Sequence, residues 1–410
     1  MKKIIITLFL ILATSFMASA EVILINVSQP IDKQFVKINV TYYINNVFDL
    51  DSETLLIPTG CILHFSDKGR FCNGTIIGSN TSIEASKHLI FDDIHIKGEW
   101  KITTVYSEWV NLDQGDIPNN KQFQSLMTLC KGSELTHLYT EQGEFSLNAI
   151  NNSAPIIVPS NIYWHNRSTL KLRGCDYSKY SLVLLNKVEN VTIEGGVFVG
   201  DILEHTGNNG EWGHGIKCGG SKNINLRDLE CRNFWGDGID LIEGIDSHNK
   251  PSIVCDSIKI HNVKCLYNRR QGLSIEAAHN VHISNSKFSY TGNIKKTNPS
   301  AGIDIEPWDN DGKKISNIII EDCVMENNSG PDLMVYIPSH LKAQQNFNVS
   351  IINCVIGFSF IYRVAGVSFE KCNITNALRV DFSDYIKTDS YTRIKRKYIK
   401  GNSSNIFLNR

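Results

Sequence analysis

Two acidic residues, Asp304 and Glu306, alternate with isoleucine in a short segment of this 410-residue chain. In an extended strand, residues two positions apart point to the same face and lie about 6–7 Å from each other. Carboxyl groups about 6.5–9.5 Å apart can serve an inverting glycosidase as general acid and general base. Crowding of like charges would raise the pKa of at least one of them, as a general acid requires. Asp304 and Glu306 are therefore the leading catalytic candidates.

Matching segments elsewhere in the chain supply further acids, Asp237, Asp240 and Glu276. Asp237 and Asp240 are expected to support catalysis, and Glu276 would lie about 8 Å from Asp240 on a neighbouring strand. Arginine binds carboxylates through two parallel hydrogen bonds, and tryptophan can stack on sugar rings. The candidate substrate-binding residues are the polar and aromatic side chains expected beside these acids: Arg269, Arg270, Glu276, Trp212, Trp235, Trp308, His214 and Lys217. The same row of acids would also suit a plain solvated face or a bound cation.

The elements that would position these residues repeat along the chain. A Gly-apolar-X-apolar phrase begins at Gly215, Gly238, Gly272 and Gly302, and a second phrase with two alternating apolar residues lies between its copies. Without insertions, the second phrase follows the first by 8 residues and precedes the next by 15, so one round takes 23 residues. A period in the twenties, built from short strands, predicts a parallel β-solenoid.

The phase of the repeat predicts which side chains form the core. Inward ladders are expected from two sets of apolar residues: Ile239, Leu273, Ile303 and Leu333, and Val191, Ile224, Ile258, Val281, Ile318 and Val349. Most cysteines of the repeats fall at inward positions too, where free thiols behave as small buried hydrophobes. Insertions between 203 and 212 and between 295 and 300 fall at the turn that enters the acidic strands, where they would wall a groove.

The chain is expected to form one elongated domain with recognisable segments. A helix is predicted from about Asn120 to Lys131, because apolar residues recur there at helical spacing, and we expect it to cover the first coil. The predicted segments are a signal peptide (1–20), an N-terminal β-roll of irregular coils (21–110), a capping helix with early coils (111–180), the regular β-helix (181–377) and a basic C-terminal tail (378–410).

Composition narrows the function classes. The formal net charge of −1 gives no indication of nucleic-acid binding, and no stretch after the first 20 residues is apolar enough to span a bilayer. The first 20 residues have the basic start, apolar run and small-residue end of a secretory signal, with the cut expected after Ala20. The sequence predicts a periplasmic or secreted protein with a polysaccharide or oligosaccharide as its partner.

From about residue 55 to 375 the chain resembles the pectin-lyase-like superfamily, in segments 57–98, 268–275 and 301–307. This resemblance implies an all-β, right-handed parallel β-helix. Within the superfamily, the segment 236–240 is similar to the Asn-Thr-Asp-Gly-Ile-Asp strand of polygalacturonases, which implies a catalytic role for Asp237. The next coils depart from that family, because Arg270-Gln271 stands in place of Asp-Asp and Ser300-Ala301-Gly302 in place of Gly-His-Gly. The groove is expected to carry over without the polygalacturonase machinery.

Three functions remain open from the sequence. A glycoside hydrolase is favoured, with no metal or cofactor. A polysaccharide lyase or uronate epimerase is the second reading, with Arg270 and His214 abstracting a proton and Ca²⁺ as a possible cofactor. The third is a β-helix that binds glycans without catalysis.

Overall fold

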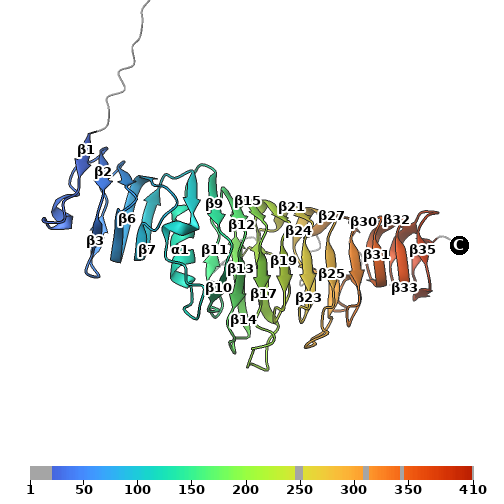
Figure 1. Ribbon diagram of the computed structural model, residues 1–410. Helices are drawn as coiled ribbons and strands as arrows, with labels where there is room; N and C mark the ends of the chain where they lie inside the picture. The colour runs from blue at the N-terminus through green and yellow to red at the C-terminus, as the bar shows by residue number, and fades with distance from the viewer. Residues whose placement is uncertain (1–20, 245–252, 308–313, 342–345, 409–410) are drawn as a thin grey trace, which may run out of the picture.

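The computed structural model describes residues 21–244, 253–307, 314–341 and 346–408. The predicted signal peptide (1–20) and Trp308 lie outside the described residues. The chain winds into an elongated stack of short strands (Figure 1). All strand pairs between described residues are parallel, so the predicted parallel β-helix is confirmed. No helix among the described residues is long and apolar enough to cross a membrane.

The strands form three sheets. The first contains β1 (Val22–Leu24), β2 (Thr41–Ile44), β3 (Val47–Asp49), β4 (Thr54–Leu56), β5 (Ile62–Phe65), β6 (Arg70–Glu84) and β7 (Phe91–Trp100). The second contains β8 (Thr104–Tyr106), β9 (Thr136–Thr140), β12 (Ile162–Asn166), β15 (Glu189–Glu194), β18 (Lys222–Arg227), β21 (Cys255–His261), β24 (Ala278–Ser284), β27 (Ile315–Glu321), β30 (Asn346–Ile352), β32 (Ala365–Glu370), β34 (Asp384–Thr388) and β37 (Ser404–Phe407).

The third sheet carries the candidate site. It contains β10 (Glu144–Leu147), β11 (Ile156–Ile157), β13 (Thr169–Leu172), β14 (Lys179–Asn186), β16 (Val197–Val199), β17 (Trp212–Gly219), β19 (Glu230–Arg232), β20 (Ile239–Ile242), β22 (Lys264–Leu266), β23 (Gln271–Ile275), β25 (Lys287–Ser289), β26 (Ala301–Ile305), β28 (Val324–Glu326), β29 (Leu333–Tyr336), β31 (Val355–Tyr362), β33 (Asn373–Asp381), β35 (Arg393–Ile394) and β36 (Lys397–Lys400). Two 3₁₀ turns, η1 (Ile31–Lys33) and η2 (Ser107–Trp109), and one α-helix complete the described elements.

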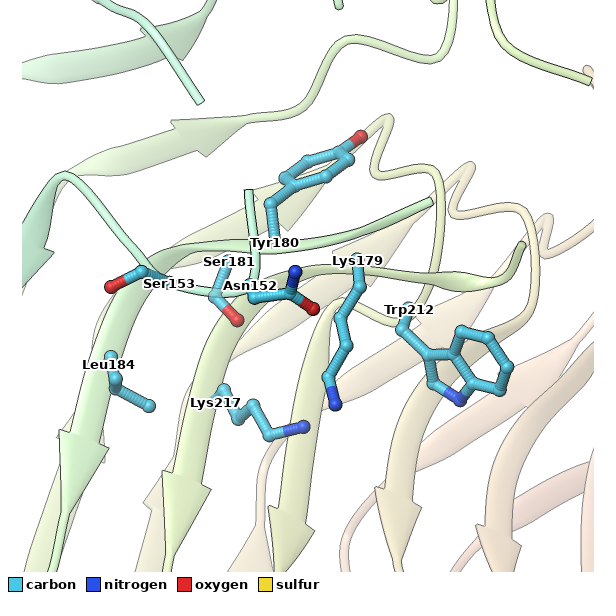
Figure 2. A pocket seen from close by; sticks show the side chains of 8 residues that line it. All are labelled: Asn152, Ser153, Lys179, Tyr180, Ser181, Leu184, Trp212 and Lys217. Carbon is cyan, nitrogen blue, oxygen red and sulfur yellow. The ribbon is translucent and has the colours of Figure 1, made fainter. Parts of the chain in front are cut away.

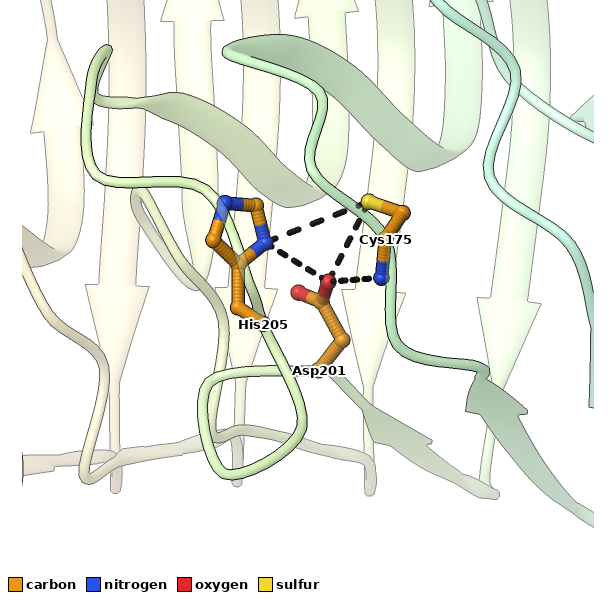
Figure 3. Close-up of side chains that lie close together, drawn as sticks. All are labelled: Cys175, Asp201 and His205. Carbon is orange, nitrogen blue, oxygen red and sulfur yellow. Dashed lines mark hydrogen bonds and ion pairs between the residues drawn. The ribbon is translucent and has the colours of Figure 1, made fainter.

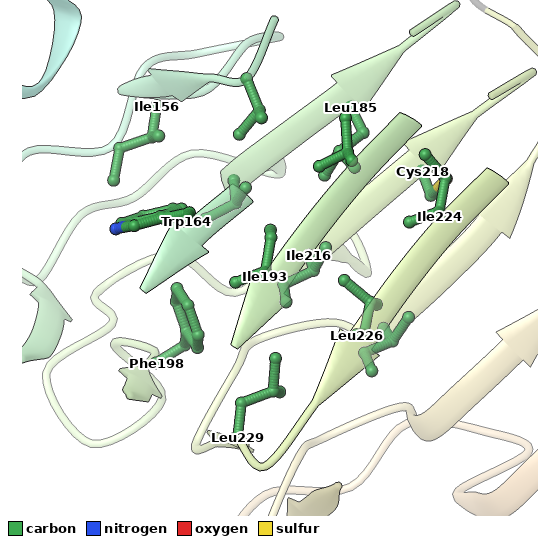
Figure 4. Close-up of a cluster of buried hydrophobic side chains, with 14 of the residues drawn as sticks. Ile156, Trp164, Leu185, Ile193, Phe198, Ile216, Cys218, Ile224, Leu226 and Leu229 are labelled. Carbon is green, nitrogen blue, oxygen red and sulfur yellow. The ribbon is translucent and has the colours of Figure 1, made fainter. Parts of the chain in front are cut away.

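Both predicted inward ladders are confirmed. Strands β20, β23, β26 and β29 pair so that Ile239, Leu273, Ile303 and Leu333 are consecutive partners. The second ladder runs in the same way from β15 to β30. Their side chains are 0–1% exposed, and Figure 4 shows part of the resulting core, with Ile193, Ile216 and Leu226 packed between the sheets. Burial of these apolar rows is the main stabilising contribution to such a stack.

The predicted helix is confirmed as α1 (Asn120–Leu129), with Phe123, Leu126 and Met127 buried. Its expected position over the first coil is wrong. The helix packs against β7, β8 and β11, between the first sheet and the rest of the stack (Figure 1). Ser125 donates a hydrogen bond to the carbonyl oxygen of Ile94 in β7, which fixes the helix at this junction.

The segment 378–410 is not a separate tail, which corrects the prediction. Strands β34 and β37 continue the second sheet, and β35 and β36 continue the third. Ile386 is buried there although most of its neighbours are charged or polar. The basic residues made the alternation of buried and exposed positions hard to recognise in the sequence, although this segment forms further coils of the stack.

At one turn of the stack, asparagine recurs from coil to coil, with Ser257 in its place on one coil. We call these residues the asparagine ladder: Asn161, Asn190, Asn223, Asn280, Asn317 and Asn348. Each has a positive φ, between 50° and 59°, which asparagine tolerates better than most residues. Side-chain amides bond along the row, as from Asn317 Nδ2 to Asn280 Oδ1 at 3.1 Å and from Asn348 Nδ2 to Asn317 Oδ1 at 2.8 Å. These hydrogen bonds stabilise the turn, and the candidate site lies elsewhere, on the third sheet.

Candidate functional site

Four consecutive strands of the third sheet present one outward column. Lys217 of β17 is the register partner of Asp240 in β20, which pairs with Ser274 in β23, which pairs with Asp304 in β26. Their strand neighbours on either side point into the core, so these four side chains point away from it. We call Asp237, Asp240, Glu276, Asp304 and Glu306, which gather on and around this column, the acidic cluster.

Arg270, in the turn before β23, lies at the centre of the acidic cluster. Its Nη1 is 3.2 Å from Asp237 Oδ2, and its Nη2 is 3.6 Å from Glu276 Oε1. Burial by itself would lower the pKa of the guanidinium, but Asp237, Glu276 and Asp240 raise it overall. Arg270 therefore stays charged and compensates the acids around it.

His214 and Lys217 lie at the other side of the cluster. The backbone N–H of Asp237 lies 3.2 Å from His214 Nδ1, and this nitrogen also lies 3.3 Å from Asp237 Oδ2. His214 Nε2 lies 3.6 Å from Asp240 Oδ2, and Lys217 Nζ lies 3.4 Å from the same oxygen. Asp240 thus faces two groups that favour its ionised form.

Asp304 is 1% exposed, which corrects the expectation of an open acidic face. Its Oδ2 accepts a hydrogen bond from Gln271 Nε2, and its register partner is the outward Ser274. Asp237 and Asp240 are buried as well. Arg270, from the next coil, contacts Asp237 at 3.2 Å, and strand alternation alone does not reveal the burial of these aspartates.

The acids differ in the pKa that their surroundings impose. Burial raises the pKa of Glu276 to about 8, and the nearby Asp240 charge adds to the rise despite Arg270. Burial also acts to raise the pKa of Asp240, but Lys217, His214 and Arg270 together hold it below its ordinary value. Burial is the main cause of the raised pKa of Asp304, and the charge of Glu306 raises it further. Burial is also the main cause of the raised pKa of Glu306. At neutral pH, Asp240 is ionised and Glu276 is largely protonated.

Several buried polar atoms in this region have no hydrogen-bond partner among the described residues. A buried polar atom without a partner costs about 1–3 kcal/mol, so a concentration of them indicates a place where a ligand or water supplies the bonds. The atoms concerned belong to adjacent coils: His214 Nε2, Asp237 Oδ1, Asp240 Oδ1, Arg270 Nε, Gln271 Oε1 and Asp304 Oδ1.

A pocket lies beside the acidic cluster, on the side of β14. Figure 2 shows Lys217 and Trp212 on either side of Lys179 at its rim, with Asn152 and Tyr180 nearby. Trp212 is 45% exposed, so its indole is available to a sugar ring. Lys217 connects the pocket to the cluster through Asp240. Lys179 was missed in the sequence because it precedes the repeat phrases, although its register partner is Trp212.

Two other predicted binding residues, Trp235 and Arg269, are not available to a ligand. Trp235 is 3% exposed, and the Arg269 guanidinium lies 3.8 Å from its ring centroid. His205 also stacks on Trp235, at 3.9 Å between centroids. Arg269 Nη1 donates to the carbonyl oxygen of Gly210 at 2.8 Å. The predicted roles of Trp235 as an open platform and of Arg269 as a substrate ligand are therefore wrong, and both residues hold the loop before β17.

Aromatic residues continue the same face beyond the acids. Tyr336 of β29 pairs with Tyr362 of β31, and their rings stack with centroids 4.9 Å apart. Burial raises the pKa of Tyr336, and Glu306 contributes to the rise, which places this tyrosine next to the acidic cluster. Tyr336 occupies the same outward column as Glu306 in the repeat, so its signal was present in the sequence.

Comparison with known proteins finds distant similarities in sequence and in structure. No family model matches the chain. Two uncharacterized proteins of Bacillus subtilis are similar: the SPbeta prophage-derived YorA, 22% identical over 273 residues, covers 60% of this chain and 46% of its own length, and YclG, 31% identical over 170 residues, covers 40% and 29%. The chain thus spans less than half the length of these curated relatives.

Solved structures with a similar fold include a tailspike protein of Acinetobacter baumannii bacteriophage Fri1, a capsular polysaccharide depolymerase, with 14% identity and a TM-score of 0.42 over 75% of this chain and 57% of that one. The mannuronan C-5 epimerase A-module of Azotobacter vinelandii has 11% identity and a TM-score of 0.46 over 74% and 96%. A family 28 exopolygalacturonase of Yersinia enterocolitica has 10% identity and a TM-score of 0.38 over 94% and 78%.

Proposed function

We propose that the protein is an exported, polysaccharide-active enzyme, an inverting glycoside hydrolase in which Glu276 is the general acid and Asp240 the general base. The observation that carries this proposal is that two neighbouring carboxyl groups have pKa values shifted in opposite directions. Such a pair supplies one protonated and one ionised carboxyl at neutral pH, as acid–base catalysis requires.

The strand register supports the spacing. Glu276 lies two residues beyond Ser274, the register partner of Asp240, so their backbones are about 8 Å apart on the diagonal. Carboxyl groups held at a similar separation would suit inversion, in which a water molecule fits between the base and the sugar. Glu276 would protonate the glycosidic oxygen as its bond to the anomeric carbon breaks. Asp240 would take a proton from the water that attacks that carbon from the opposite face.

The remaining acids receive different roles from those first expected. The pKa of both Asp304 and Glu306 is raised, so that pair does not show the opposite shifts of Glu276 and Asp240. We assign them to hydrogen bonds with sugar hydroxyls, next to Tyr336. Asp237 holds Arg270 and contacts the ring of His214 at 3.3 Å, which orients the groups around Asp240.

Proton abstraction by Arg270, one of the two bases expected in the lyase or epimerase alternative, fits the site less well. A base must lose its proton near the working pH, but the acids around Arg270 raise the pKa of its guanidinium. A guanidinium held charged can bind an anionic group of a substrate, and cannot serve as the base.

The test is incubation of the purified protein with a panel of polysaccharides, followed by product analysis. New reducing ends of inverted anomeric configuration support the proposal, whereas the ultraviolet absorbance of unsaturated uronates indicates a lyase, and binding without products indicates a glycan-binding protein. Glu276→Gln and Asp240→Asn should each lower kcat by about 10²–10⁴-fold. Glu230→Gln, in the same sheet but paired with Arg232 at 3.2 Å, is the matched control and should keep full activity. Full activity of both cluster variants contradicts the assignment.

A further inference from the structure

A second cluster of reactive side chains lies outside the acidic cluster, at the turn that precedes β14 and β17. Cys175 comes from the turn between β13 and β14, and Asp201 and His205 come from the loop between β16 and β17. Figure 3 shows the three side chains pointing toward one another. This loop belongs to the insertion that interrupts the 23-residue repeat, so the cluster is not a product of the solenoid's regular stacking.

Three potential ligand atoms converge in this cluster. Asp201 Oδ2 lies 2.8 Å from His205 Nδ1 and 3.2 Å from Cys175 Sγ, and Sγ lies 3.9 Å from Nδ1. Tetrahedral Zn²⁺ sites have metal–ligand distances of about 2.0–2.3 Å, which place neighbouring ligand atoms roughly 3.3–3.7 Å apart. The measured separations bracket this range, so small side-chain rotations would bring all three atoms into the zinc geometry.

The surroundings hold these ligands in place. The second carboxylate oxygen of Asp201 accepts a hydrogen bond from the hydroxyl of Tyr180. The His205 ring stacks on Trp235, and the side chains of Asp201 and His205 are fully buried. In metal sites, hydrogen bonds and packing contacts to the ligand side chains orient the ligands in this way.

A Cys-His-Asp catalytic triad would need a different arrangement. In such a triad, the nucleophile and the acid contact opposite nitrogens of the histidine. Here Asp201 and Cys175 both approach Nδ1, and His205 Nε2 is buried without a hydrogen-bond partner among the described residues. The arrangement therefore suits a shared cation better than nucleophilic catalysis.

We propose that Cys175 Sγ, Asp201 Oδ2 and His205 Nδ1 bind one Zn²⁺, with the fourth position open to water. A thiolate, an imidazole and a carboxylate together match the borderline-soft character of zinc. The ion would tie the inserted loop to the turn before β14. Since that loop leads into Trp212, zinc would hold one wall of the pocket in place. This site is independent of the proposed hydrolase activity.

The test uses the full mature chain, stripped of metal with a chelator and then titrated with Zn²⁺. We expect about one Zn²⁺ per chain by mass spectrometry of the metal, and a thiolate-to-metal charge-transfer band when Co²⁺ replaces it. Cys175→Ser should abolish the band and weaken Zn²⁺ binding at least about tenfold, and His205→Gln should weaken binding similarly. Circular dichroism of both variants checks that they fold.

Cys72→Ser is the matched control, because Cys72 is also a partly exposed free thiol but lies in β6, far along the chain from the cluster. It should bind Zn²⁺ and show the Co²⁺ band like the unmodified protein. The proposal is overturned if the unmodified protein binds no Zn²⁺ at stoichiometric amounts, or if folded Cys175→Ser keeps the unmodified protein's affinity and band.

Discussion

The acidic cluster and the asparagine ladder arise from the same repeat. They differ in how completely their polar side-chain atoms are hydrogen-bonded. In the ladder, asparagine recurs on most coils, lies mainly at the surface and bonds to its neighbouring copy, as from Asn223 to Asn190 at 3.1 Å. In the outward column of the acidic cluster the residue changes from Lys217 to Asp240, Ser274 and Asp304, and buried polar atoms such as Asp240 Oδ1 and Asp304 Oδ1 have no partner among the described residues. A uniform column stabilises the stack, whereas a varied, buried and incompletely bonded column indicates a site.

The largest loss of stability is expected when the Arg270 guanidinium, at the centre of the acidic cluster, is removed. Arg270→Gln leaves Asp237 buried without its cation, and breaking a buried ion pair costs about 3–5 kcal/mol. We expect that loss in the free energy of unfolding measured with urea. Arg232→Gln, whose exposed arginine pairs with Glu230, should cost about 1 kcal/mol or less. Equal losses in both variants would show that Arg270 does not hold the cluster together.

The pH dependence sharpens the comparison, because asparagine does not titrate and Glu276 does. The pKa of Glu276 is about 8 in the folded protein, against an ordinary 4.5, so the folded state binds more protons than the unfolded state between these values. Stability from this group is complete below about pH 4.5 and is lost as the pH rises through about 8, at up to about 1.4 kcal/mol per pH unit. Glu276→Gln should remove this slope, so that the variant gains stability relative to the unmodified protein as the pH rises.

Activity should follow the same two groups. It should fall above about pH 8, as Glu276 loses its proton, and fall again below the ordinary value of 3.8 for aspartate, as Asp240 gains one. Urea unfolding and initial rates across this pH range provide the measurements. An activity that keeps rising well above pH 8 would exclude Glu276 as the general acid.

The smallest effect is expected in the ladder. Asn317→Ala removes amide bonds to Asn280 and Asn348 and places alanine at φ 57°, at a cost of about 1–2 kcal/mol. Asn317→Gly loses the same bonds but tolerates the backbone, so it should cost less than alanine. Polysaccharide turnover should be unchanged in both. A loss of activity with intact folding would mean that the ladder also serves the site.

The sequence by itself determined the register of this protein. A 23-residue period with apolar residues at fixed phases allows one in-register parallel stacking, since a shift by one residue would expose every ladder residue. The core ladders and the order of Lys217, Asp240 and Asp304 along one outward column followed from it. Helix α1 followed from a separate signal, the helical spacing of its apolar residues.

Only the tertiary structure decided how deeply the outward column is buried. It also decided that the loop before β17 places Asp201 and His205 beside Cys175. The opposite pKa shifts of Asp240 and Glu276 depend on burial and on the reach of Arg270 and Lys217, which the repeat does not specify. Trp235 is buried and stacks on His205, and the repeat does not specify this packing either. The contact of Cys175 with Asp201 joins residues 26 positions apart, and Asp201 lies at the start of the loop that carries the insertion. Periodicity predicts which residues share a face, but side-chain packing and loop paths decide their exposure, charge and partners.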